Sequence, residues 1–158
     1  MVEIEINLKN LDDGLSRLIA LGRDPTPIHR GVAGILADIP ERAFREQADP
    51  VTGEAWAELS PVTVSRRGSA TPILQVSGQL AGSMQSEYGR DFARVSTNKI
   101  YATTMFFGAK KGEFGRTKRG APIPWGDIPA RPFMGIGPQD EANIMDFVRD
   151  AVAATLTD

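Results

Sequence analysis

The sequence of 158 residues contains no cysteine and a single histidine, His29. Without thiols the chain can hold no disulfide framework, thiol nucleophile or thiolate metal site. One imidazole confines general acid–base schemes to carboxylates and lysines, and it excludes histidine-rich metal sites. No motif accompanies His29, which favours a structural role for it at least as much as a functional one. These shortages argue against most classes of enzyme.

Long apolar runs and a large charge of one sign are also missing. No run approaches the roughly 20 residues of a membrane span, and the opening MVEIEINLKN carries glutamates where a secretory signal would carry lysines. The sequence therefore predicts a cytosolic protein with no membrane partner. With 18 basic and 20 acidic residues, the net charge of −2 argues against a nucleic-acid-binding surface over the whole protein. The length and the 41% apolar content predict one globular domain over residues 1–158.

The first half of the chain is predicted to be mostly helical. Alternation of apolar residues with glutamate predicts a strand over residues 2–8. An apolar stripe then predicts a short helix with Asn10 as its cap and Gly22 just past its end. A longer helix is predicted to start near Pro25. Pro40 lacks an amide hydrogen, so we expect it to kink or split this helix.

The second half is predicted to mix short elements. Ser60 and Pro61 indicate the cap and first residue of a short helix before Gly68, and Ser77 indicates another short helix reaching Met84. The segment DFARVSTN predicts a strand, YATTMFF fits helix or strand, and PQDE begins a predicted C-terminal helix. This order favours an α+β fold with a small mixed sheet and packed helices over a βαβ repeat.

Carboxylates are abundant but do not form a recognisable site. Asp12 with Asp13, and Asp140 with Glu141, lie at predicted helix starts, where negative charge is stabilised by the helix dipole. We therefore predict no catalytic residue, no metal site and no cofactor.

Residues 108–120, GAKKGEFGRTKRG, are glycine-rich and basic, with Glu113 as the single acid. This composition predicts an exposed, mobile loop, and the segment lacks the Gly-Lys-Ser/Thr ending of a phosphate-binding loop. Its charges either solvate the loop or dock on an acidic partner or on phosphates, and the sequence leaves both alternatives open. The five cations are Lys110, Lys111, Arg116, Lys118 and Arg119.

Two further features concern packing or interfaces. Trp56 and Trp125 lie in irregular segments, where anchoring a loop on the core is the commoner role and an interface contact is the alternative. In PARPFMG, prolines on both sides of Arg131 stiffen the backbone, so this segment is predicted to run extended along a sheet or a neighbouring subunit. We expect Phe133 to be buried and Arg131 to pair with a carboxylate, within the subunit or across an interface.

Taken in order, several segments resemble the phage virion morphogenesis family, the tail-completion proteins of Mu-like phages. The matching landmarks extend from roughly residue 28 to the C-terminus, about four-fifths of the chain. They are ERAFREQADPVTGEAW, LSPVT, ILQVSGQLAGSM, VSTNKIYATTMFFG, IPARPFMGI and the closing helix after Pro-Gln-Asp-Glu.

The resemblance implies a non-enzymatic structural protein of the virion neck, assembled in the host cytoplasm. Such a subunit is expected to form a homo-oligomeric ring, a hexamer with twelve copies as the alternative, that completes the tail and joins it to the head. Expected partners are further copies of the chain, adjoining neck and tail-tube proteins and, if it acts as a stopper, DNA in the channel. A carboxylate-based small enzyme is the less favoured alternative. The expected interface residues are the five cations with Trp56, Trp125, Arg131 and Phe133.

Overall fold

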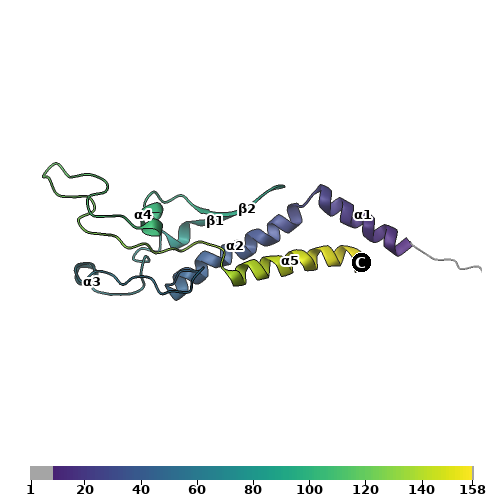
Figure 1. Ribbon diagram of the computed structural model, residues 1–158, viewed down its shortest axis with the longest axis horizontal. Coiled ribbons are helices and arrows are strands. Elements are labelled where there is room, and N and C mark those ends of the chain that lie inside the picture. The colour runs from purple at the N-terminus through teal and green to yellow at the C-terminus, as the bar shows by residue number, and fades with distance from the viewer. Residues whose placement is uncertain (1–8, 158) are drawn as a thin grey trace, which may run out of the picture.

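The computed structural model describes residues 9–157 and shows an elongated molecule whose middle is built in three layers (Figure 1). Helix α2 (Thr26–Glu46) is the central layer. Helix α5 (Pro138–Thr157) lies along one side of it, and an antiparallel hairpin of β1 (Met84–Tyr88) and β2 (Ala93–Thr97) lies along the other (Figure 1). The predicted α+β class is confirmed.

Shorter elements extend this middle toward both ends of the molecule. Helix α1 (Lys9–Arg23) packs against α5 at one end, while α3 (Pro61–Arg67) and α4 (Ala102–Phe107) lie toward the other (Figure 1). A single 3-10 turn, η1 (Ala81–Ser83), leads into β1. Among the described helices, none combines the length and the apolar composition that crossing a membrane requires.

Helices α2 and α5 run antiparallel and are held by two different contacts. An α carbon without a side chain at Gly31 leaves room for the Phe147 ring, because a Cβ there would lie 1.9 Å from that ring. One turn into α5, Asp140 is 2% exposed, and both its carboxylate oxygens accept hydrogen bonds at 2.8 Å from Arg42. Asp140 also accepts the Gly137 amide at 3.2 Å, so this carboxylate caps α5 as well as tying it to α2.

The hairpin is tied to the opposite side of α2 by side-chain-to-backbone hydrogen bonds. The Ser86 hydroxyl donates to the Ala33 carbonyl at 2.8 Å. His29 Nδ1 lies 3.0 Å from the Gly89 carbonyl, so this nitrogen carries the hydrogen and donates it. The single histidine thus has a structural role, holding the hairpin turn on the helix.

The aromatic core lies at the C-terminal end of α2. Phe44 stacks on Phe133 with ring centroids 5.4 Å apart and meets Trp56 edge-on at 5.6 Å. Phe106 of α4 meets the other face of Phe133 edge-on at 5.3 Å. Smaller apolar side chains close the cluster: Ala43, Ile73, Leu80 and Ala102. Segments far apart in the sequence therefore converge on Phe133, which is 0% exposed.

Several helix boundaries follow the predicted signals, and others do not. The Ser60 hydroxyl accepts the Thr63 amide at 3.2 Å and α3 ends at Gly68, as predicted. Helix α2 begins after Pro25 as expected and continues through Pro40 as one long helix. Of the two alternatives predicted at Pro40, the split is wrong and the kink stays a prediction. Proline inside a helix costs about 3 kcal/mol. Packing of the fully buried Pro40 ring offsets this cost.

The predicted helix over residues 77–84 is also wrong. Gly78 has a φ of 67°, which interrupts an α-helix, and the chain forms only η1 before entering β1. At the N-terminus, α1 already includes Asn10 and Gly22, so neither has the predicted capping role. The strand predicted over residues 2–8 lies outside the described residues. Within residues 9–157 the sheet is a two-stranded antiparallel hairpin and not a mixed sheet.

The close packing of the Phe147 ring on Gly31 leads to a prediction about stability. Gly31→Ala places a methyl group where the Phe147 ring lies, so we expect a loss of about 1–3 kcal/mol in the free energy of unfolding, measured by urea denaturation. Gly34→Ala is the matched control, because no atom lies within 4 Å of its added Cβ and alanine favours a helix by up to about 1 kcal/mol. Equal stabilities of the two variants would contradict the described packing of α5 on α2.

Candidate assembly surfaces

Residues 108–128, here called the arm, project from the end of the molecule that carries the aromatic core (Figure 1). The arm is a folded ladder: Ala109 and Ile128 exchange hydrogen bonds of 2.9 and 2.7 Å at its base. Further out, the Phe114 amide donates to Ile123 at 2.8 Å and the Thr117 amide donates to Ala121 at 2.8 Å. The predicted exposure of this segment is confirmed, while its mobility stays a prediction.

The base of the arm is fixed by the fold. The Arg131 amide donates to the Met105 carbonyl at 3.0 Å, which brings the two ends of the arm together. At Gly108 the φ is 76°, and a Cβ would lie 2.5 Å from the Ile128 carbonyl oxygen. Only glycine fits this close approach of the two chain segments. The arm therefore leaves the core in a defined direction.

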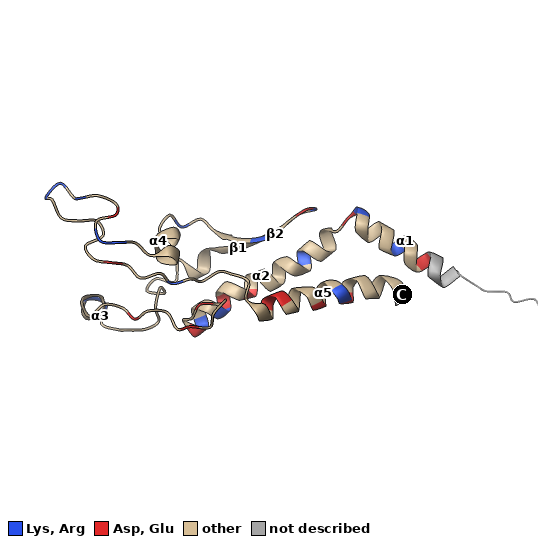
Figure 2. Ribbon diagram, viewed as in Figure 1, with Lys and Arg blue, Asp and Glu red and all other residues tan. Residues whose placement is uncertain are grey.

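The positive charge of the arm is concentrated toward its tip, where Figure 2 shows lysine and arginine. All five cations are exposed. Near the base, Asp127 accepts the Lys111 amide at 2.8 Å and lies 3.4 Å from the Lys110 ammonium. The Lys111 hydrogen bond, followed by the charge of Lys110, lowers the pKa of the Asp127 carboxyl.

Apolar side chains accompany these charges. Trp125 is 70% exposed and Phe114 is 54% exposed. Ile123, which lies opposite Phe114 in the ladder, is also exposed. Phe107, at the end of α4 where the arm begins, is 73% exposed. Aromatic groups among cations, outside any core of their own, are typical of protein interfaces. The arm thus combines both kinds of side chain that an interface uses.

Three residues named as interface candidates lie inside the subunit, which confirms the predicted burial of Phe133 and the commoner predicted role of Trp56. The Trp56 indole donates to the Pro132 carbonyl at 2.6 Å, and Phe133 lies in the centre of the aromatic core. Arg131 is 5% exposed, and its guanidinium donates to the carbonyls of Ala57 at 2.9 Å and Glu58 at 3.0 Å. Among the described residues these acceptors are main-chain carbonyls and not the predicted carboxylate. Burial lowers the pKa of Arg131.

The structure adds a surface that the sequence interpretation missed, residues 46–58, here called the acidic strap. It carries Glu46, Asp49, Glu54 and Glu58, and no lysine or arginine occurs from residue 46 to residue 65. Asp49 caps the turn within it by accepting the Val51 amide at 2.7 Å. Glu54 and Glu58 are exposed. The missed signal was this run of carboxylates without a cation, which composition over the whole chain conceals.

A groove of about 430 Å³ adjoins the strap, between α3 and the base of the arm. Its lining is mostly apolar and includes Leu59, Leu74 and Met105, with Val76 at 75% exposure. Arg67 of α3, and Asp127 and Ile128 at the base of the arm, also line it. Glu58 lies at its edge. We call it the α3 groove.

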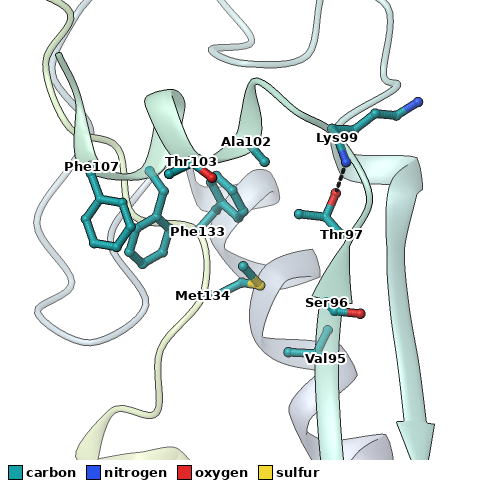
Figure 3. Close-up of a pocket in the computed structure, with 10 residues that line it drawn as sticks. Val95, Ser96, Thr97, Lys99, Ala102, Thr103, Phe107, Phe133 and Met134 are labelled. Carbon is teal, nitrogen blue, oxygen red and sulfur yellow. Dashed lines mark hydrogen bonds between the residues drawn. The ribbon is translucent and has the colours of Figure 1, made fainter. Parts of the chain in front are cut away.

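A second hollow of about 450 Å³ lies between β2, α4 and the segment that follows Arg131 (Figure 3). Figure 3 shows Phe107, Phe133 and Met134 on one side and Val95 and neighbouring strand residues on the other. Ala102 and Thr103 of α4 close the top. This pocket contains no carboxylate, so it gives no support to the alternative of a carboxylate-based enzyme.

The described part of the chain also offers no cluster of three or more histidine, aspartate and glutamate side chains that could hold a metal ion. Asp24, like Asp127, has a lowered pKa, because it accepts hydrogen bonds from Thr26. Both carboxylates are exposed, and their main partners are residues that they cap. Their pKa shifts therefore reflect hydrogen bonds that the carboxylates accept from these residues.

Comparison with known proteins supports the family resemblance over nearly the full length of the chain. The sequence profile of the phage virion morphogenesis family matches residues 6–153. The chain is 33% identical to the putative capsid assembly protein G of Escherichia phage Mu, with 98% of this chain and 96% of that protein covered. It is 34% identical to the Mu-like prophage FluMu G protein 2 of Haemophilus influenzae, with 95% of each covered. No solved structure matches the chain.

The burial of Arg131 leads to a prediction about folding. Arg131→Met keeps an apolar stem but leaves two carbonyls without their donor, so we expect the isolated subunit to lose about 2–3 kcal/mol in its free energy of unfolding. Arg119→Met, in the exposed part of the arm, is the control and should unfold like the wild type. If Arg131→Met is as stable as the wild type but fails to assemble, the role at an interface inferred from the sequence is the correct one.

Proposed function

Because the chain belongs to the phage virion morphogenesis family, we propose that it is a non-enzymatic structural subunit of the neck of a tailed phage. In this role, copies of the chain form a ring that completes the tail and joins it to the head, as a tail terminator or head–tail connector. The observation that carries the proposal is a subunit with far more surface than its own core requires.

The exposed area quantifies this observation. The accessible surface is 11105 Å², whereas a compact monomer of this mass exposes roughly 7,800 Å². The nine residues outside the described part could account for at most about 1,400 Å² of the difference. The remaining excess of about 2,000 Å² is comparable to two standard interfaces, since each partner in one buries about 800 Å². A ring subunit with two neighbours would cover an area of this size.

Two exposed surfaces support contacts of this kind. The cations of the arm are exposed, and so are Glu54 and Glu58 of the acidic strap. A folded arm that is anchored at its base loses less conformational entropy on docking than a free tail would lose. We expect six copies in the ring, as the family resemblance implies, with adjoining neck and tail-tube proteins as further partners.

A second candidate function follows from the name of the Mu relative, putative capsid assembly protein G. A protein that acts during head assembly would affect the head itself, whereas a joining protein would leave heads and tails intact but separate. A stopper that contacts channel DNA through the basic arm is a variant of the joining role. Particle morphology separates the first two functions directly.

We therefore expect particles assembled without this protein to consist of full-sized heads beside unjoined tails, seen by electron microscopy. A wild-type copy supplied in trans should restore joined particles. Aberrant or missing heads would support the capsid-assembly role instead, and infectious virions that lack the protein would contradict both. The copy number per restored particle, measured by quantitative mass spectrometry, tests the expected ring of six.

The five cations of the arm should matter for joining but not for folding. Serine at positions 110, 111, 116, 118 and 119 leaves the main-chain ladder of the arm in place, so the melting temperature should stay near that of the wild type. Exposed ion pairs contribute about 0.2–1 kcal/mol each, so the loss of five should make joining defective or more sensitive to salt. Infectious yields like those of the wild type at all ionic strengths would show that the cations only solvate the arm.

A further inference from the structure

Charge is divided unevenly between the arm and the rest of the chain. The arm carries five cations against Glu113 and Asp127, so the remainder of a chain with net charge −2 has an excess of five negative charges. Among the stretches without lysine or arginine, the one with the most carboxylates includes the acidic strap. One chain thus carries a positive surface and a negative surface that are separate in its sequence.

The cations of the arm do not pair with the carboxylates of the strap within the described part of the subunit, although the base of the arm and Glu58 border the same groove. In Figure 2 the basic tip of the arm lies at one extremity of the molecule, away from the strap at the end of α2. The contacts described for arm cations are with Asp127 and with main-chain oxygen, both inside the arm. Arm and strap are therefore both available to another molecule.

Their apolar neighbours are complementary as well. The arm presents Trp125 and Phe114 beside its charges, and the strap adjoins the apolar α3 groove with Val76 and Leu59. Insertion of a tryptophan ring into such a groove removes about 150–250 Å² from water. The arm carries cations beside aromatic side chains, and the strap carries carboxylates beside an apolar groove. The two surfaces are therefore complementary in charge and in apolar character.

We propose that the arm of one copy docks on the acidic strap and α3 groove of the next copy of this chain. The inference rests on the proposed ring and specifies its subunit contact. Unlike surfaces can pair reciprocally in a two-fold dimer or head-to-tail along a series of copies. The proposed ring requires the head-to-tail arrangement, which closes when its rotation permits and otherwise continues as a filament. Every copy then uses its arm toward one neighbour and its groove toward the other.

A second copy fits this arm better than DNA does. Phosphates would satisfy the cations, but duplex DNA offers no pocket for the exposed Trp125 and Phe114 rings. A neighbouring copy supplies both anions and a pocket in one place, since Glu58 lies at the edge of the α3 groove. Binding of DNA by the arm is accordingly an outcome that the tests must detect.

Charge reversal tests the electrostatic part by sedimentation velocity. Lys118→Glu with Arg119→Glu should weaken self-association about tenfold or more, and so should Glu54→Lys with Glu58→Lys. Combining all four substitutions in one chain should restore association, because the reversed surfaces again attract. Arg23→Glu with Arg30→Glu is the matched control, which reverses two exposed cations away from the arm, the strap and α3 and should leave association unchanged. No recovery in the fourfold variant would overturn the proposed pairing.

The absence of native cysteine allows a decisive cross-linking test in purified protein and in assembled particles. A chain with both Lys118→Cys and Ala57→Cys, one at the arm tip and one in the strap, is treated with a thiol oxidant that takes up the two electrons and two protons of each disulfide formed. It should give a ladder of covalent multimers ending at the ring size. Each single variant alone should form no covalent multimers. A mixture of the two single variants should stop at dimers. If the double variant also stops at dimers, the contact is a reciprocal two-fold one and the head-to-tail arrangement is overturned.

The other outcomes separate the two proposals. Rings without the ladder, or a product cross-linked within one chain, would overturn the docking of the arm while leaving the ring in place. Arm variants that assemble normally but lose retention of duplex DNA would assign the arm to DNA. Particles with joined heads and tails in the absence of the protein would overturn the proposed function itself.

Discussion

The contacts of Arg131 and Phe133 are the constraint on which the placement of the arm, the strap and the α3 groove depends. Arg131 holds the strap through the carbonyls of Ala57 and Glu58 and holds α4 through its own amide on Met105. Phe133 lies between Phe44 of α2 and Phe106 of α4. One short segment therefore fixes the end of α2, the strap and both ends of the arm relative to one another, and the direction of the arm follows from this arrangement.

Much of the fold follows from local signals. The apolar stripes of α2 and α5, the Ser60 cap and the strand near DFARVSTN were predictable because each depends on neighbours within one or two turns. Pro40 and Gly78 were not. The burial that offsets the helix-breaking cost of Pro40, and the positive φ at Gly78, are decided by packing between distant segments. Such tertiary effects override propensities of a few kcal/mol.

The candidate surfaces divide in the same way. Exposure of the basic segment was predictable from its composition, because few apolar groups could hold it against a core. The core role of Trp56 was the commoner of its two predicted roles, but its partner and those of Arg131 were not predictable, since Pro132 and Ala57 are more than 70 residues away in the sequence. Proline on both sides of Arg131 indicated a stiff segment, but stiffness alone does not distinguish an internal tie from an external one. The strap was missed because its significance appears only opposite the arm.

The distribution of charge also bears on which assemblies can form. Two arms brought together would place ten cations against four carboxylates, so a symmetric arm-to-arm contact is repelled. Two straps would likewise repel, and their carboxylates are not paired with arm cations within the subunit. The arrangement that brings opposite charges together is the unlike one, arm to strap, and in a ring this pairing runs head-to-tail from each copy to the next. Charge thus favours the contact between arm and strap over contacts between like surfaces before any close packing is formed. The apolar side chains of the arm and the groove then add affinity to that contact.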